Sequence, residues 1–286
     1  MKVYLTMKTD RANAIDCAAR VVQRLGRHDV SIYMAREQAD AFPVPPIGIE
    51  PVAGPDEGIA LCDAVVAVGG DGTIFHAAAD AMRREKPVLG INAGRLGFLA
   101  QAEGNDLSPL DRFAAGDYEI ERRLVLRVEV QQGRDTAVFY AVNDAVISKP
   151  DFGHVSEIEV RCGGDLVGVY RADGVIFATP TGSTAYSLSA GGPIADPAVD
   201  CMMMTPLASH SLVSRSIVFA GDKVLAVTTP DADAKTLFLT IDGVAIDAVT
   251  CGTVVTIRRA EYETRFVRLG GRSFYHILNE KMKGRG

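Results

Sequence analysis

The chain has 286 residues, of which 48% are hydrophobic and 23% are charged, and its formal net charge is −6. This balance is typical of a globular protein with a sizeable core, and the length suits two ordinary domains. The negative charge excludes a protein that binds nucleic acid through its overall electrostatics, although a few local cations could still hold a phosphate. Five cysteines with no CxxC pair exclude a zinc site or a disulfide framework and predict free thiols in a reducing, cytoplasmic compartment. The sequence has neither a signal-peptide core nor an apolar run long enough to span a membrane.

In the first hundred residues, patterns typical of strands alternate with patterns typical of helices. Strands are predicted at 3–7, 29–34, 64–68 and 87–92, and helices at 11–27 and directly after Asp71. Such alternation indicates a parallel sheet covered by helices, and ligands of such sheets bind at the carboxyl ends of the strands. Two glycine-containing segments, 69–72 and 92–98, fall at such ends.

Beyond about residue 120 the chain reads as one strand after another. Alternating runs joined by glycine-containing turns continue through most of the remaining sequence. This half is predicted to be an antiparallel β-sandwich. The segment 274–282 is helical again and could return to the first domain. We therefore expect an α/β domain over 1–118, with 271–286 folding back onto it, and a β domain over 119–270.

The stretch VAVGGDGTIF places a carboxylate among glycines, between a predicted buried strand and a predicted helix. In one interpretation Gly69, Gly70 and Gly72 only allow a sharp turn, and Asp71 or Thr73 caps the helix. In the other, bare backbone N–H groups in this turn bind phosphate oxygens. The stretch is not a Walker A loop, because no Lys-Ser/Thr pair follows. A carboxylate here would repel phosphate unless it accepted a proton from an attacking hydroxyl or helped to hold a divalent cation, so Asp71 is a candidate catalytic residue.

A second constellation, TPTGSTAYSLSAGGP (179–193), lies between a predicted strand and a helix start rich in small residues. It could be a solvated Ser/Thr loop with one packed tyrosine. Its hydroxyl groups, which can donate and accept, and the ring of Tyr186, which can stack, suit a base and a ribose better. Arg171 and Asp173 precede this loop by one strand length, and the planar guanidinium of Arg171 suits a phosphate.

Asn143 and Asp144 form a third candidate, at one end of the predicted strand in AVNDAVISK. An asparagine beside a carboxylate could simply cap a turn. Alternatively, Asn143 could bind the edge of an adenine, and Asp144 could accept hydrogen bonds from the hydroxyls of a ribose.

Taken in this order, the motifs resemble those of NAD kinases. The similarity rests on GGDGT, NAGRLGF, the Asn143–Asp144 pair, RADG, TPTGSTAYSLSAGGP and TPLASHSLVSRSIVF, and it covers the chain from about residue 60 to 280. GGDGT alone is not specific, because diacylglycerol, sphingoid and phosphofructo-kinases carry relatives of it, whereas TPTGSTAYSLSAGGP is highly specific. The resemblance implies a Rossmann-like first domain and a β-sandwich second domain. It also implies that ATP, with a divalent cation expected to be Mg²⁺, phosphorylates the 2′-hydroxyl of the adenosine ribose of NAD.

The resemblance further implies roles for individual residues. Asp71 matches the proton acceptor, and the positions implied to bind the ATP phosphates are Gly69, Gly70, Gly72 and Thr73. The family often has glutamate at the position of Asp144, so this carboxylate is shortened here, and a glutamine used by some members is absent from IDGVAID (241–247). The residues implied to contact NAD are Asp71, Gly72, Phe98, Asn143, Asp144, His154, Arg171, Asp173, Thr184, Ala185, Tyr186, Ser187, Leu188, Ser189 and Ala208.

Homodimers or homotetramers are also implied by the resemblance, and no nucleic acid or membrane is expected as a partner. The sequence leaves two other functions open. A lipid kinase of the GGDGT superfamily would act on diacylglycerol or a sphingoid base, but the sequence has no polybasic amphipathic helix and a hydroxyl-rich loop suits lipid poorly. A dinucleotide sensor without enzymatic activity would gain little from Asp71 beside phosphates.

The remaining distinctive residues are expected to have ordinary structural roles. His76 is predicted to be a packed or surface histidine rather than a catalytic one. The methionine-rich run 201–205 is predicted to lie in the core or at a subunit contact. Arg258, Arg259 and Arg265 are predicted to lie on a solvated face rather than to bind a phosphate tail.

Overall fold

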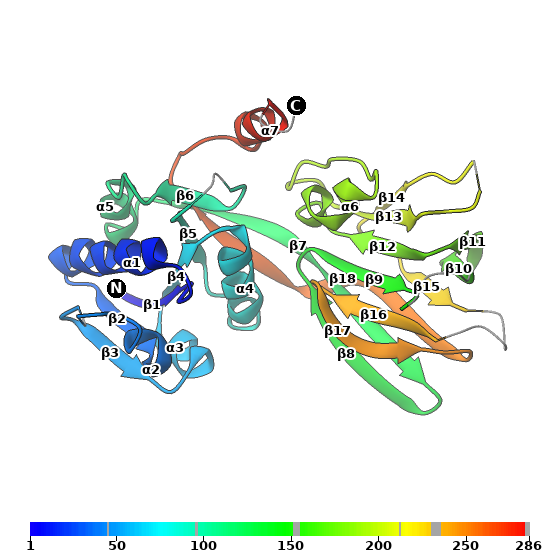
Figure 1. Ribbon diagram of the computed structural model, residues 1–286, viewed down its shortest axis with the longest axis horizontal. Helices are drawn as coiled ribbons and strands as arrows, with labels where there is room; N and C mark the ends of the chain where they lie inside the picture. The colour runs from blue at the N-terminus through cyan, green and yellow to red at the C-terminus, as the bar shows by residue number, and fades with distance from the viewer. Residues whose placement is uncertain (45, 95–96, 151–154, 212, 230–235, 284–286) are drawn as a thin grey trace. The chain divides into compact units, whose positions relative to one another are not determined.

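The computed structural model describes residues 1–44, 46–94, 97–150, 155–211, 213–229 and 236–283. The chain divides into two units: the first contains Met1–Arg122 and Thr264–Gly286, and the second contains Arg123–Glu263. The chain passes between them twice, within the long strands β7 (Glu119–Gln132) and β18 (Thr253–Arg268) (Figure 1). In the part of the chain that is described, no helix combines the length and the apolar character needed to cross a membrane.

The first unit is built on a parallel sheet with the strand order β3-β2-β1-β4-β5, and β6 lies parallel to β5. The end of β18 also pairs with β5, where Phe266 lies opposite Val88. Strand β4 is buried along its whole length, as expected for a central strand of a covered parallel sheet. The strands are β1 (Lys2–Met7), β2 (Ser31–Ala35), β3 (Ile49–Val52), β4 (Ala64–Gly69), β5 (Val88–Asn92) and β6 (Ala100–Glu103).

The two faces of this sheet have different environments. Val3 and Leu5 of β1 point into one hydrophobic core with residues of α1 and α5. Tyr4 and Thr6, which alternate with them, line a cavity together with residues of α3 and α4. The helices of the unit are α1 (Ala12–Leu25), α2 (Arg36–Ala39), α3 (Pro55–Leu61), α4 (Asp71–Ala81), α5 (Pro109–Ala114) and α7 (Phe274–Lys283).

The second unit contains two antiparallel sheets. One has the strand order β14-β13-β12-β9-β16-β17, and the other contains β11-β10-β15-β18 with β7 beside β18 and β8 beside β7. Leu126 and Ile257 of the second sheet share one hydrophobic core with Phe177 and Met204 of the first, so the two sheets form a sandwich. The other elements are β8 (Asp135–Ala141), β9 (Asp144–Ser148), β10 (Ser156–Cys162), β11 (Asp165–Ala172), β12 (Gly174–Ala178), α6 (Tyr186–Ser189), β13 (Cys201–Leu207), β14 (Ile217–Ala220), β15 (Leu225–Thr228), β16 (Leu237–Ile241) and β17 (Val244–Val249).

The fold class predicted from the sequence is confirmed: an α/β unit with a parallel sheet, an antiparallel sandwich, and a helix near the C-terminal end. The methionine-rich run forms the start of β13, and Met202, Met203 and Met204 are fully buried, so this run belongs to the core. The short elements β3, α3, β6 and α5 were not predicted, because their few residues carry too little periodicity.

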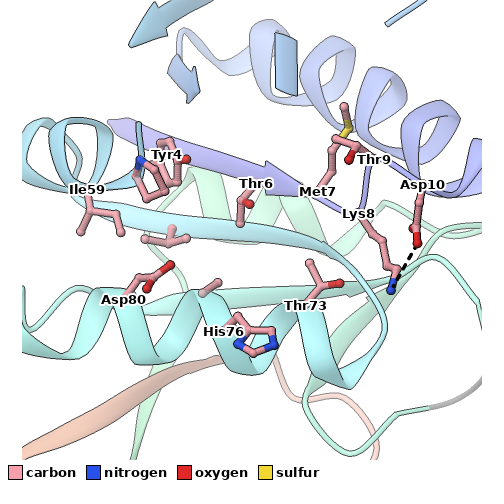
Figure 2. A pocket seen from close by; sticks show the side chains of 13 residues that line it. Tyr4, Thr6, Met7, Lys8, Thr9, Asp10, Ile59, Thr73, His76 and Asp80 are labelled. Atoms are coloured by element: carbon pink, nitrogen blue, oxygen red, sulfur yellow. Dashed lines mark ion pairs between the residues drawn. The ribbon is translucent and has the colours of Figure 1, made fainter. Parts of the chain in front are cut away.

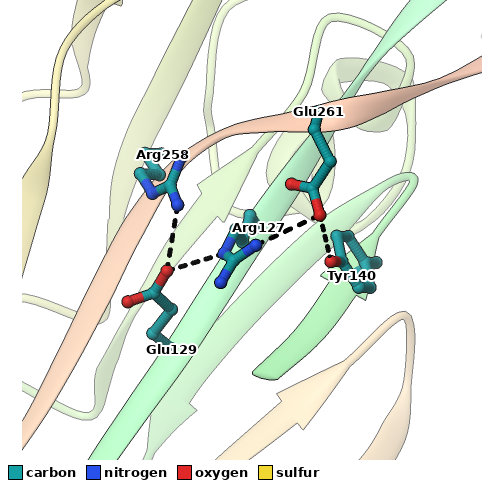
Figure 3. Close-up of polar contacts among 5 residues, drawn as sticks. All are labelled: Arg127, Glu129, Tyr140, Arg258 and Glu261. Atoms are coloured by element: carbon teal, nitrogen blue, oxygen red, sulfur yellow. Dashed lines mark hydrogen bonds and ion pairs between the residues drawn. The ribbon is translucent and has the colours of Figure 1, made fainter. Parts of the chain in front are cut away.

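The arginines near the end of the chain form ion pairs. Arg258 belongs to a network across β7, β8 and β18, in which Glu129 accepts from Arg127 at 2.6 Å and from Arg258 at 3.1 Å (Figure 3). Glu261 accepts from Arg127 at 3.1 Å and from the Tyr140 hydroxyl. The hydrogen bond from Arg127 is the main cause that holds the pKa of Glu129 below its ordinary value. This network therefore links neighbouring strands of the sandwich.

The other two arginines are engaged in the same way. Arg259 pairs with Asp200 at 3.0 Å and with Glu263 at 2.7 Å, and Arg265 pairs with Glu85 at 2.9 Å. All these side chains are partly exposed, so the pairs are surface contacts that contribute modestly to stability.

Candidate active site

Asp71 is the first residue of α4 and follows the turn at the end of the buried strand β4. Its Oδ2 accepts the backbone N–H of Phe98 at 2.9 Å, and its Oδ1 accepts that of Leu99 at 3.1 Å. The ammonium of Lys281 lies 3.3 Å from Oδ2. Within the described residues no side chain caps the N-terminus of α4, so the interpretation of Asp71 or Thr73 as a helix cap is wrong. The carboxylate is instead held in one orientation by a neighbouring turn.

The glycines near Asp71 serve different purposes. A Cβ on Gly97 would lie 2.1 Å from Asp71 Oδ1, so the turn can approach the carboxylate only with glycine at this position. A Cβ on Gly69 would lie 2.4 Å from the hydroxyl of Thr73, so Gly69 is a packing requirement. A Cβ on Gly70 would meet open space. Packing therefore does not require glycine at position 70. The absence of a side chain there instead leaves the backbone N–H groups of the turn accessible.

A cavity of about 510 Å³ opens beside this loop, at the carboxyl ends of β1, β4 and β5. Gly69 and Gly70 line it together with the cations Lys8 and Arg11. Arg11 directly precedes α1, and the N-termini of helices such as α1 and α4 attract anions. The sequence interpretation missed Lys8 and Arg11, although two cations directly after a predicted strand were the available signal. The cavity suits a chain of phosphates.

A second cavity, of about 410 Å³, lies between β1 and α4 and also contacts Lys8 (Figure 2). Tyr4 and Thr6 line it from β1, and Thr73 and His76 line it from α4. Polar side chains are unusual between a parallel sheet and its covering helix, so this groove can accept a polar ligand beside the cavity at Gly69 and Gly70. His76, predicted as a packed or surface residue, thus borders a groove. Among the described residues, no three His, Cys, Asp or Glu side chains gather into a cluster that could hold a metal ion by themselves.

In the second unit, Asp242 organises the turn that contains Asn143 and Asp144. Its carboxylate accepts the backbone N–H groups of Val142 at 2.9 Å, Asn143 at 2.8 Å and Asp144 at 3.0 Å. Asp242 has a φ of 53° and is followed by Gly243, which is a typical turn between two antiparallel strands. The sequence interpretation assigned no role to Asp242. The Asp-Gly pair could have indicated the turn, but not the distant backbone that its side chain binds.

Asp144 is 5% exposed. Burial raises the pKa of its carboxyl to about 7, and the nearby charge of Asp242 contributes in the same direction. Asn143 packs against the hydroxyl-rich loop, because a Cβ on Gly182 would lie 2.1 Å from the Asn143 carbonyl oxygen. The structure therefore brings the Asn143–Asp144 pair and the loop 179–189 together, as two neighbouring candidate segments of one unit.

Several hydroxyls of the loop 179–189 point inward. Thr179 donates to the carbonyl of Val142 at 2.6 Å, and Ser183 donates to a carbonyl within the loop at 2.6 Å. The hydroxyl of Ser187 lies 3.2 Å from that of Thr205. Thr179, Ser183 and Ser187 are all fully buried, so these groups hold the loop in shape. Ser187 is implied by the resemblance to contact NAD, but its side chain is one of these three buried hydroxyls.

Other loop residues face outward. Tyr186 is 49% exposed, so the interpretation of it as a core tyrosine is wrong. Its ring is accessible for stacking. Thr184, Ala185 and Leu188 are half-buried, and Ser189 is exposed. The candidate His154 lies outside the described residues.

Arg171, Asp173 and Ala208 are brought together where β11 and β13 end. The N–H of His210 donates to the Arg171 carbonyl at 2.9 Å, and the N–H of Asp173 donates at 2.9 Å to the carbonyl of the residue before Ala208. Lys149, which the sequence interpretation missed, pairs with Asp173 at 2.6 Å. The Arg171 guanidinium lies 3.5 Å from the carboxylate of Glu157, and its side chain is 68% exposed, so the rest of the guanidinium is accessible to a ligand.

Together these features define a class of protein: an α/β unit with a glycine loop and a fixed carboxylate at the ends of parallel strands, joined to a β-sandwich with a hydroxyl-rich loop. The profile of the ATP-NAD kinase N-terminal domain matches residues 3–118, and that of the ATP-NAD kinase C-terminal domain matches residues 142–269. The NAD kinase of Symbiobacterium thermophilum is 40% identical over 99% of both chains, and that of Heliobacterium modesticaldum is 35% identical over 98% of both. The chain therefore belongs to the ATP-NAD kinase family, which confirms the resemblance found in the sequence.

Solved structures show the same fold. The crystal structure of yeast NADH kinase complexed with NADH matches with a TM-score of 0.88 and 23% identity, over 99% of this chain and 87% of the other. The structure of an NAD kinase from Archaeoglobus fulgidus in complex with ATP matches with a TM-score of 0.76 and 25% identity over the whole of both chains.

Proposed function

We propose that this protein is an NAD kinase, which transfers the γ-phosphoryl group of ATP to the 2′-hydroxyl of the adenosine ribose of NAD. The observation that carries the proposal is the Asp71 carboxylate, held by two backbone N–H groups beside an open glycine loop. Such a carboxylate can accept a proton from a hydroxyl in front of a phosphate chain. Family membership, with near-complete coverage of relatives named NAD kinase, supports the same reaction.

The donor phosphates bind in the cavity lined by Gly69, Gly70, Lys8 and Arg11. Backbone N–H groups and the N-terminal end of α4 hold their oxygens, and the two cations offset their charge. The divalent cation arrives with the nucleotide as part of the substrate, since Mg²⁺ is ordinarily bound through phosphates and one or two carboxylates. It neutralises the phosphates and so lets a carboxylate stand near them.

Asp71 receives the proton of the ribose hydroxyl while the hydroxyl oxygen forms its bond to the γ-phosphorus. A carboxylate is a weak base, but phosphoryl transfer passes through a loose transition state in which positioning and charge neutralisation provide most of the catalysis. The hydrogen bonds from Phe98 and Leu99 supply that positioning.

Residues of the second unit hold the dinucleotide. Asn143 has the donors and acceptors to bind an adenine edge, and Asp144 can accept from ribose hydroxyls. Tyr186 provides an exposed ring for stacking, and Arg171 an exposed guanidinium for a phosphate. We also propose a homodimer or homotetramer in the cytoplasm. All five cysteines are free, which fits a reducing compartment.

One assay tests the function. The purified protein is incubated with ATP, MgCl₂ and NAD, and NADP is measured with an NADP-specific dehydrogenase. We expect NADP to form in proportion to enzyme and time. A protein that binds NAD without forming NADP would be a sensor, and one that instead phosphorylates diacylglycerol would be a lipid kinase; either result contradicts the proposal.

Gly70→Val is expected to weaken ATP binding by about tenfold or more, because a branched side chain would cover backbone N–H groups that bind phosphate. The fold should be kept, since Gly70 has an extended backbone and open space around it. Gly69→Val is the matched contrast: it clashes with Thr73 and should lower the melting temperature. Calorimetric titration with ATP and thermal melts measure both. Unchanged ATP affinity in a folded Gly70→Val protein would mean that this loop does not bind the phosphates.

Tyr186→Ala is expected to weaken NAD binding by about tenfold to a hundredfold, the usual worth of one stacked base. Because the ring is half exposed, the melting temperature without ligand should hardly change. The stabilisation by added NAD should shrink, since that shift follows affinity. Phe238→Ala, at an exposed position of the same unit, is the control and should keep the full NAD shift. A full NAD shift in Tyr186→Ala would rule out stacking on this ring.

A further inference from the structure

Helix α7 brings a cation to the candidate catalytic carboxylate from the far end of the chain. The ammonium of Lys281 lies 3.3 Å from Asp71 Oδ2, and the two side chains are 25% and 32% exposed. Both residues belong to the first unit. In the sequence they are far apart, so no motif points to this contact.

Lys281 is held in place by the packing of its own helix. Its Nζ lies 4.2 Å from the centre of the Phe98 ring, a distance typical of a cation–π contact. The Phe98 ring in turn packs against Phe274, with centroids 5.7 Å apart. Phe274, the buried Ile277 and Lys281 recur at helical spacing, so they lie on one face of α7. The ammonium is therefore directed at Asp71 by a docked helix face.

The contacts of Asp71 distinguish its two carboxylate oxygens. Oδ2 accepts from Phe98 and also from Lys281, whereas Oδ1 accepts only the N–H of Leu99 among the contacts that the described residues make. Each carboxylate oxygen can accept about two hydrogen bonds. Oδ1 thus has capacity for one further donor, such as a substrate hydroxyl.

We propose that Lys281 is a positioning residue for phosphoryl transfer, acting through Asp71; this rests on the proposed function. It occupies Oδ2, so that Oδ1 takes the proton of the ribose 2′-hydroxyl. That hydroxyl oxygen forms the new bond to the γ-phosphorus as the bond from γ-phosphorus to the oxygen of the leaving ADP breaks. The positive charge of Lys281 also attracts the donor phosphates. It thereby offsets the repulsion between these phosphates and the Asp71 carboxylate.

Steady-state kinetics of Lys281→Met test this role. We expect kcat to fall about ten- to a hundredfold, the usual worth of a hydrogen bond between charged groups, with the KM for NAD changed less than about threefold. Lys281→Arg should recover most of the rate, because a guanidinium keeps both the charge and the ring contact. Lys283→Met is the matched control: it removes a lysine of the same helix that pairs with Glu280, and should keep wild-type kinetics.

A double mutant distinguishes a role through Asp71 from a purely structural role of Lys281. If Lys281 acts through Asp71, Lys281→Met should cause little further loss of kcat in the Asp71→Asn background, because the effects of residues that act as a unit are not additive. An additive loss there, an unchanged or higher kcat for Lys281→Met alone, or a Lys281→Arg protein as slow as Lys281→Met would overturn the proposal. Failure of the proposed function would be visible separately, because the wild-type protein would then form no NADP.

Discussion

Asp71→Asn is expected to reduce the turnover of NAD by about 10²- to 10⁴-fold, the range typical for loss of a proton-accepting side chain. Asparagine has nearly the same shape as aspartate but cannot accept the proton of the ribose hydroxyl. Its NH₂ group also replaces one of the two carboxylate oxygens: either Oδ2, which accepts from Phe98 and Lys281, or Oδ1, which accepts from Leu99. The affinity for NAD should stay within a few-fold of wild type, because the proposed dinucleotide contacts lie mostly in the second unit.

Turnover is measured by NADP formation, and NAD binding by calorimetry, on the same preparation. Asp29→Asn is a suitable control, since Asp29 has a φ of 53°, a conformation that asparagine adopts readily. The control should match wild type in both measurements. Turnover of Asp71→Asn near the wild-type rate would refute the assignment of Asp71 as proton acceptor.

The fold was predictable because its signals are local. Strands such as β4 and helices such as α1 show apolar runs or helical spacing, and the change from alternating elements to consecutive strands separates an α/β unit from a sandwich. The glycine loop was predictable for the same reason, since Gly69, Gly70 and Asp71 are neighbours in sequence. Short elements such as β3 and α5 have no comparable signal.

The site was less predictable wherever it depends on contacts between distant segments. Asp242 binds the turn at Asn143, and Lys281 binds Asp71, and in neither case does sequence spacing relate the partners. A hydroxyl-rich motif also does not reveal which hydroxyls face a ligand. The hydroxyl of Ser183 bonds within the loop and that of Ser187 bonds to Thr205, and only burial distinguishes these two serines from Ser189.

Asp144 is expected to make the stability of the protein depend on pH. The pKa of its carboxyl is raised from an ordinary value of 3.8 to about 7, first by burial and then by the charge of Asp242. Below about pH 4 the carboxyl is protonated in both the folded and the unfolded chain, so its titration does not change the free energy of unfolding. Between about pH 4 and 7 the folded chain retains the proton that the unfolded chain has lost, so the free energy of unfolding falls as the pH rises. The full difference in pKa corresponds to about 4 kcal/mol.

Asp144→Asn should remove this dependence, because asparagine resembles the protonated carboxyl and stays neutral at every pH. At pH 8 the variant should melt about 8–16 °C above wild type, since 1 kcal/mol shifts the melting temperature of a domain of this size by about 2–4 °C. At pH 4.5 the two proteins should melt at nearly the same temperature. At pH 8 the variant should nevertheless bind NAD more weakly than the wild type, because the ionised carboxylate of the wild type accepts hydrogen bonds from ribose hydroxyls better than the variant amide.

Melting curves of wild type and Asp144→Asn between pH 4.5 and 8.5 measure the effect. Asp165→Asn, at an exposed position in the same unit, is the control for loss of one negative charge, and its melting temperature should follow that of wild type at every pH. Parallel curves for wild type and Asp144→Asn across the range would show that Asp144 does not retain its proton in the folded chain. In that case the buried carboxylate would have to be stabilised as an anion, and the raised pKa assigned to burial and to Asp242 would be wrong.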